Sequence, residues 1–124
     1  MWGRLPIISL FSGAGGLDLW FHNAGFQTIW ANEYDSTIWE TFQTNFPDTF
    51  LDKRSIVNIP VSEVPDSLWI IWWPPCQSWS EAGAWRGIND QRGKLFFEYI
   101  RILKEKEPLF FFGRKCFLNS FAET

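Results

Sequence analysis

The sequence predicts an α/β fold in which a parallel sheet is built from alternating strands and helices. Short apolar runs alternate with segments of helical periodicity along the chain. One run, LWIIWW at residues 68–73, is unbroken and short, which is typical of a strand buried on both faces of a parallel sheet. The segment FSGAGG at residues 11–16 follows the first apolar run, where a strand would turn into a helix. These three observations favour repeated βαβ units.

Each element follows from apolar periodicity and from the residues that interrupt it. The run at residues 5–11 predicts the first strand, and the glycines after it separate that strand from a helix over residues 17–24. Residues 92–106 predict the clearest helix, because apolar side chains recur on one face and Pro108 follows. The other expected elements are a strand over 27–32, a helix over about 36–45, a weak strand over 50–56, and strands over 68–73 and 109–112.

Length and composition restrict the class of protein. The 124 residues fit one domain, and a net charge of −3 gives no long-range attraction for nucleic acid. The two cysteines lack metal or disulfide spacing, so we expect no metal site and a reducing cytoplasm. No apolar run reaches the ~20 residues of a membrane helix, and no export signal is visible.

Cys76 is the candidate nucleophile. It follows the predicted strand at residues 68–73 in the segment PPCQSWS, where Pro74 and Pro75 end the strand and stiffen its exit. The carboxyl ends of parallel strands are where open α/β sheets bind ligands. The alternative is that Cys76 is a small buried apolar residue, as most lone cysteines are.

The glycine loop at residues 11–16 is the candidate cofactor site. Glycines between a strand and a helix let a ligand approach the backbone, although such loops are often simple tight turns. Glu33, at the end of the second predicted strand, is placed to accept hydrogen bonds from ribose hydroxyls. Together they indicate an adenosine-containing cofactor, either a dinucleotide or S-adenosylmethionine. A nucleotide-binding module or an NAD-dependent oxidoreductase therefore remains an alternative.

Four segments in order, FSGAGGLDL, ANEYD, PPCQSWS and RGKLFFEYIRIL, resemble the successive motifs of the DNA (cytosine-5) methyltransferases. The resemblance covers nearly all of residues 5–112 and is closest to bacterial restriction-modification enzymes. It implies a Rossmann-like, S-adenosylmethionine-dependent methyltransferase sheet of about five parallel strands in the order 3-2-1-4-5.

The resemblance also implies roles for individual residues. Glu33 would hold the ribose of S-adenosylmethionine, Tyr34 would face its adenine, and Cys76 would attack C6 of a cytosine flipped out of duplex DNA. The methyl group would then pass to C5 of that cytosine. The cofactor contacts implied are Phe11, Gly13, Gly15, Gly16, Leu17, Glu33, Tyr34 and Leu95.

The sequence departs from the family pattern at several positions. Ser55 stands where relatives have an aspartate that contacts adenine, and Trp72 and Trp73 stand where they have two glycines. After residue 112 the chain reads GRKC in place of Glu-Asn-Val, the motif whose glutamate activates the cytosine. We therefore expect residues 1–112 to be the cofactor-binding and nucleophile-bearing part of a truncated methyltransferase that lacks its target-recognition domain. Residues 113–124 would be an aberrant tail, and one interpretation of it is a frameshift.

These departures predict that the chain alone is inactive. One alternative is a split methyltransferase, in which a second chain supplies Glu-Asn-Val and the recognition domain. The apolar strand at residues 109–112 would be an uncovered sheet edge, so we also expect self-association through it.

Overall fold

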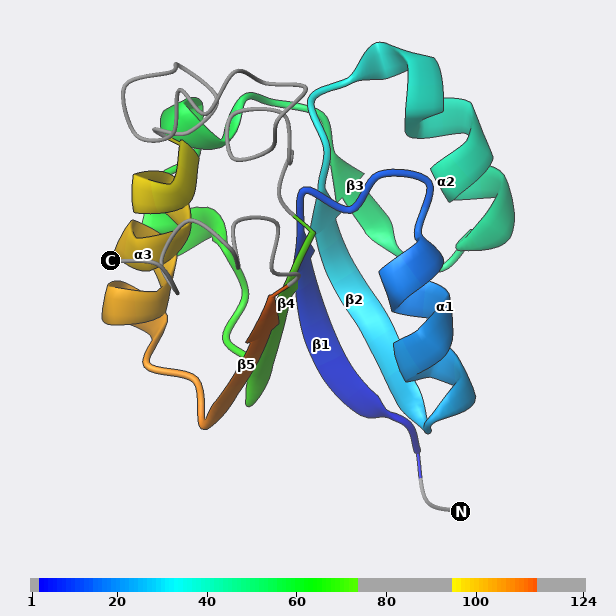
Figure 1. Cartoon of the computed structure of the whole chain (residues 1–124), viewed down its shortest axis with the longest axis horizontal. Helices are drawn as coiled ribbons and strands as arrows, with labels where there is room; N and C mark the ends of the chain where they lie inside the picture. The colour runs from blue at the N-terminus through cyan, green and yellow to red at the C-terminus, as the bar shows by residue number, and fades with distance from the viewer. Residues whose placement is uncertain (1–2, 74–94, 114–124) are drawn as a thin grey trace, which may run out of the picture.

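The computed structural model describes residues 3–73 and 95–113, which form one parallel sheet of five strands with helices on both faces (Figure 1). The strand order is β3-β2-β1-β4-β5, which confirms the expected order. The chain therefore builds outward from β1 to β3, then crosses back to place β4 on the other side of β1. In open α/β sheets, ligands bind where this reversal occurs, at the carboxyl ends of the central strands, which are β1 and β4 in this sheet. The strands are β1 (Leu5–Leu10), β2 (Phe26–Asn32), β3 (Phe50–Asp52), β4 (Trp69–Trp72) and β5 (Phe110–Gly113).

Three α-helices in the described part of the chain cover the sheet. Helices α1 (Gly16–Asn23) and α2 (Trp39–Asn45) lie on one face, and α3 (Leu95–Lys106) lies on the other (Figure 1). None of the helices in the described residues is long and apolar enough to cross a bilayer.

Two expected elements differ in the structure. The helix expected over residues 36–45 begins as a short 3-10 helix, Ser36–Ile38, because the Asp35 carboxylate accepts from the Thr37 amide and caps a tighter turn. The strand expected over residues 50–56 ends at Asp52, so that prediction was too long. The Arg54 amide donates to Asp52 Oδ1 at 3.1 Å, which turns the chain out of the sheet.

The core is divided by the sheet into two apolar layers. Because side chains alternate along β4, Ile70 and Trp72 pack toward α3, while Trp69 and Ile71 pack toward α1. The expectation of a strand buried on both faces is confirmed, since Ile70, Ile71 and Trp72 are all buried. The larger layer, against α3, consists of Ile8, Leu10, Trp30, Ile56, Ile59, Val64, Ile70, Trp72, Tyr99 and Ile102.

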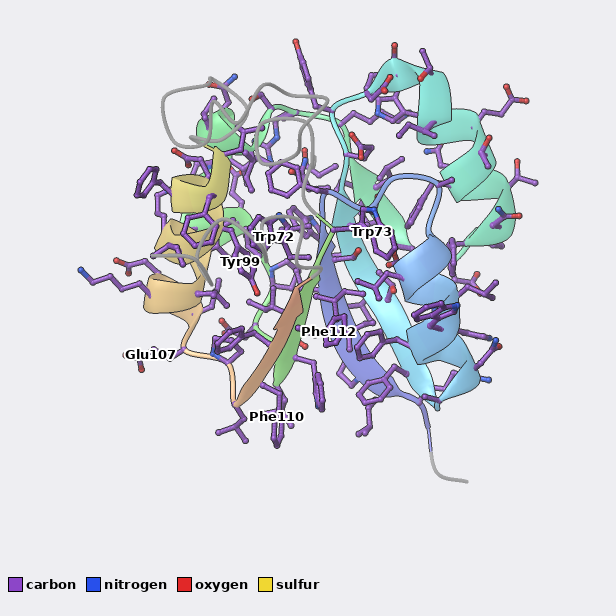
Figure 2. All side chains as sticks on the ribbon, in the orientation of Figure 1. Trp72, Trp73, Tyr99, Glu107, Phe110 and Phe112 are labelled. Carbon is purple, nitrogen blue, oxygen red and sulfur yellow. The ribbon has the colours of Figure 1, made fainter. Side chains whose placement is uncertain are left out.

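β5 forms one edge of the sheet and is exposed along its whole length. Figure 2 labels Phe110 and Phe112 on this strand. Phe110 stacks on Trp69 with ring centroids 4.6 Å apart, and Phe112 meets Phe21 edge-on at 5.7 Å. Both residues nevertheless remain about half exposed, and Phe111 is 64% exposed. The strand continues to Gly113, one residue beyond the expected end, and the remainder of the expected tail, 114–124, lies outside the described residues.

Candidate functional site

The glycine loop lies at the carboxyl end of β1 and leads into α1. Three of its residues have left-handed backbone conformations: Phe11 with φ 51°, Gly13 with φ 58° and Gly15 with φ 93°. At Gly15 a side chain is also excluded by packing, because a Cβ there would lie 2.3 Å from Cε2 of Phe46. A Cβ at Gly13 or Gly16 would meet no heavy atom within 4 Å among the described residues, so the loop has open space beside these two positions.

Glu33 connects the end of β2 to this loop. Its Oε1 accepts from the Gly13 amide at 2.9 Å, and its Oε2 accepts from the Asp35 amide at 2.9 Å. A carboxylate has about four lone-pair positions, so each oxygen retains capacity for one more donor. The structure thus brings together the loop and the acidic residue that the sequence singled out.

The backbone of Glu33 is held from two sides. Its carbonyl accepts from Nε1 of Trp39 at 2.8 Å, and its amide donates to the carbonyl of Asp52 at 3.1 Å. The buried Asn32 side chain donates to the carbonyls of Asp52 and Arg54 at 2.9 and 2.8 Å. Sequence reasoning missed Trp39 and Asn32, and only the position of Asn32 directly before Glu33 could have drawn attention to it. These contacts fix the carboxyl ends of β2 and β3 relative to each other.

An ion-pair network borders the same end of the sheet. Arg54 contacts Asp52 at 2.7 Å and Glu63 at 2.6 Å. The hydrogen bond from Arg54 holds the pKa of the Asp52 carboxyl below its usual range, despite its burial. Arg101 of α3 donates to the carbonyls of Ile59 and Ile56 at 3.2 and 3.0 Å, which anchors the segment after β3 to α3.

The remaining expected cofactor contacts occupy different environments. Phe11 and Leu95 are partly buried and pack against the same apolar layer beneath α3. Tyr34 is 70% exposed, free to face a ligand. Leu17, in contrast, is buried against Ile7 and Ile71 on the α1 side, so only its backbone could contact a cofactor.

Cys76, the expected nucleophile, lies outside the described residues, as does the rest of the segment 74–94. The described chain ends before it at Trp73, whose amide donates to the carbonyl of Leu10 at 3.1 Å. The strand that precedes Cys76 therefore stays paired with β1 up to the proline pair.

A separate cavity of about 350 Å³ lies on the α2 side of the glycine loop. It shares Gly15 and Gly16 with the expected cofactor contacts but includes none of Phe11, Glu33 and Leu95, so it adjoins the expected cofactor site rather than coinciding with it. Its lining residues are Ala14, Gly15, Gly16, Leu19, Asn45 and Phe46.

A parallel sheet with this strand order, a glycine loop after β1 and an acidic residue after β2 are typical of α/β proteins that bind nucleotide-containing cofactors. Comparison with known proteins narrows the class. The sequence profile of the C-5 cytosine-specific DNA methylases matches residues 5–113, and the chain belongs to this family.

Type II methyltransferases are among the similar proteins. The chain is 61% identical over 107 residues to M.FnuDI of Fusobacterium nucleatum, a match that covers 86% of this chain and 31% of the relative. It is 60% identical over 108 residues to M.NgoPII of Neisseria gonorrhoeae, a match that covers 86% of this chain and 32% of that relative. The chain therefore spans about a third of the length of these relatives.

Solved structures agree with the fold. A DNA modification methyltransferase encoded within an E. coli prophage superposes with a TM-score of 0.70 at 31% identity, over 87% of this chain and 31% of that one. A mutant of DNMT2 from Spodoptera frugiperda superposes with a TM-score of 0.71 at 25% identity, over 97% of this chain and 38% of that one. Both similarities confirm the methyltransferase type of α/β fold.

Proposed function

We propose that this chain is the cofactor-binding and nucleophile-bearing part of a DNA (cytosine-5) methyltransferase of the bacterial cytoplasm. S-adenosylmethionine would bind at the carboxyl ends of β1 and β2. The observation that carries the proposal is the hydrogen bond between the Gly13 amide and Glu33, which joins the glycine loop to a carboxylate with free acceptor capacity. Open space at Gly13 and Gly16 and the exposed ring of Tyr34 fit an adenosine cofactor at this position.

The proposed reaction uses Cys76 as its nucleophile. The thiolate adds to C6 of a cytosine flipped out of duplex DNA, which makes C5 electron-rich. S-adenosylmethionine supplies the methyl group that C5 takes up. Loss of the C5 proton then expels the cysteine and restores the aromatic ring.

We further propose that methyl transfer requires a complementing polypeptide. The sequence contains no Glu-Asn-Val, the motif whose glutamate activates cytosine in the resembling family. A second chain would supply this acid. It would pack on β5, whose aromatic side chains are exposed on both faces.

Without that partner, we propose that the same strand mediates self-association. An uncharged, exposed edge strand pairs readily with other chains. Residues 109–112 contain no charged side chain, and all four are apolar and exposed.

Isothermal titration calorimetry tests the cofactor proposal. S-adenosylmethionine should bind the chain and NAD should not. Glu33→Ala should weaken binding by about tenfold or more, since hydrogen bonds from ligand hydroxyls to a carboxylate contribute about 1.5–3 kcal/mol. Glu40→Ala, an exposed acid in the first turn of α2, is the matched control and should leave affinity unchanged. Binding of NAD in preference to S-adenosylmethionine would support an oxidoreductase instead.

A further inference from the structure

Trp72 occupies the carboxyl end of β4, at the end of the sheet where the proposed cofactor would bind. Its side chain is 6% exposed and stacks on Tyr99 of α3, with ring centroids 4.2 Å apart and an interplanar angle of 27° (Figure 2). Phe96, also from α3, meets the indole at 5.4 Å. Trp72 thus fills the space between the end of β4 and the start of α3.

The same indole contacts the glycine loop. The rings of Phe11 and Trp72 lie 6.2 Å apart at 53°. Phe11 has φ 51°, a conformation rare for a bulky residue, which persists only where surrounding contacts hold it. Because Trp72 is an aromatic neighbour of Phe11, it helps to set the position of the first residue of the loop.

Within the described chain, the surroundings of the buried Trp72 indole offer its N–H no polar partner. Neither its Nε1 nor the hydroxyl of Tyr99 has a hydrogen-bond partner within the described chain, although both atoms are buried. Unpartnered buried donors are costly and uncommon in native proteins. On the neighbouring strand, a Cβ at Gly113 would lie 2.9 Å from Cε3 of Trp72, so the indole lies beside β5 at a position where only glycine fits.

We propose that Trp72 determines the cofactor affinity of this chain by occupying the apolar space beside Phe11 and Leu95. This inference rests on the proposed function, because these two residues are expected cofactor contacts. Both pack against the apolar layer that contains Trp72. A ligand that needs the surfaces of Phe11 and Leu95 must therefore compete with the indole. A smaller residue at position 72 releases the loop and exposes those surfaces to the ligand.

The test compares Trp72→Ala with Trp69→Ala by calorimetric titration with S-adenosylmethionine. Trp69 lies on the same strand but on the opposite face, against Phe21 and Phe26, so its loss controls for general weakening of β4. Trp72→Ala should bind the cofactor about tenfold more tightly than the unmodified chain, a difference of about 1.4 kcal/mol. Trp69→Ala should leave affinity unchanged.

Circular dichroism shows whether each variant is folded. If Trp72→Ala is unfolded, Trp72→Phe replaces it, because a benzyl ring retains an aromatic contact with Tyr99 but removes the buried N–H. The Trp72→Phe variant should also bind S-adenosylmethionine more tightly than the unmodified chain. Equal affinity in folded position-72 variants and the unmodified chain would overturn the role of Trp72 and leave the proposed function standing. Equal tightening by Trp69→Ala would also overturn it. Absence of binding in every variant would overturn both proposals.

Discussion

At the scale of single residues, the buried carboxylate of Asp18 links three elements directly below the glycine loop. It lies in the first turn of α1 with 1% of its surface exposed. Its Oδ1 accepts from Ser9 of β1 at 3.1 Å and its Oδ2 from Thr28 of β2 at 2.8 Å. Burial raises the pKa of Asp18, and the two hydroxyl donors offset only part of that effect. The loop is therefore anchored by a group whose ionisation opposes folding.

This raised pKa predicts a pH-dependent stability. As the pH rises above 3.8, the ordinary pKa of an aspartate, Asp18 ionises first in the unfolded chain. Its contribution to the free energy of unfolding therefore falls until the carboxyl of the folded chain also ionises. Asp18→Asn cannot ionise but keeps an acceptor for one hydroxyl. Urea denaturation over a pH series should show that the unmodified chain loses stability relative to Asp18→Asn as pH rises above 3.8. A stability difference independent of pH would contradict this account.

At the same scale, the sequence indicated which residues form the candidate site but not the contacts that hold them in place. Glu33 and the glycines were recognisable because each follows an apolar run, and the end of such a run in the sequence marks the end of a strand. The indole of Trp39 and the amide of Asn32 hold Glu33 and β3 through tertiary contacts, which no local pattern reveals. Leu17 appeared in the expected ligand set only through the resemblance, and its side chain lies in the core.

At the scale of elements, the strands were predictable where burial made them continuous apolar runs. β3 was the least predictable, because three residues carry little periodicity and the turn after Asp52 depends on a side-chain hydrogen bond. β5 was expected as an exposed edge, and it is one. Its aromatic side chains alternate, with Phe110 and Phe112 facing the α1 side and Phe111 pointing the other way.

Phe111→Lys should reduce the proposed self-association. Phe111 is 64% exposed, so the substitution removes apolar surface and adds a charge to the edge without opening the core. Sedimentation velocity at increasing protein concentration should show aggregates of the unmodified chain and a monomer of the variant. Lys104→Ala, an exposed change on α3, serves as the control and should not alter association. A monodisperse unmodified monomer would contradict the edge-pairing proposal.

At the scale of the whole molecule, the strand order places the expected cofactor contacts of the described chain at one end of the sheet, where the strands have their carboxyl ends. Phe11 follows β1, Glu33 follows β2 and Leu95 begins α3, which packs over β4. Alternating strands and helices predicted the fold class, but the order β3-β2-β1-β4-β5 came from the family resemblance, since pairing between distant strands leaves no local signature. The position of Trp72 against Phe11 likewise emerged only from the folded chain.

The central claim is that S-adenosylmethionine binds at the carboxyl ends of β1 and β2. Titration of the ¹⁵N-labelled chain, followed by ¹H–¹⁵N NMR, tests it most directly, because chemical shifts detect even weak binding residue by residue. We predict saturable shifts at the amides of Phe11, Gly13, Glu33 and Tyr34, with little change along α2. Shifts confined to the cavity beside Asn45 and Phe46, or no shifts at saturating ligand, would contradict the claim.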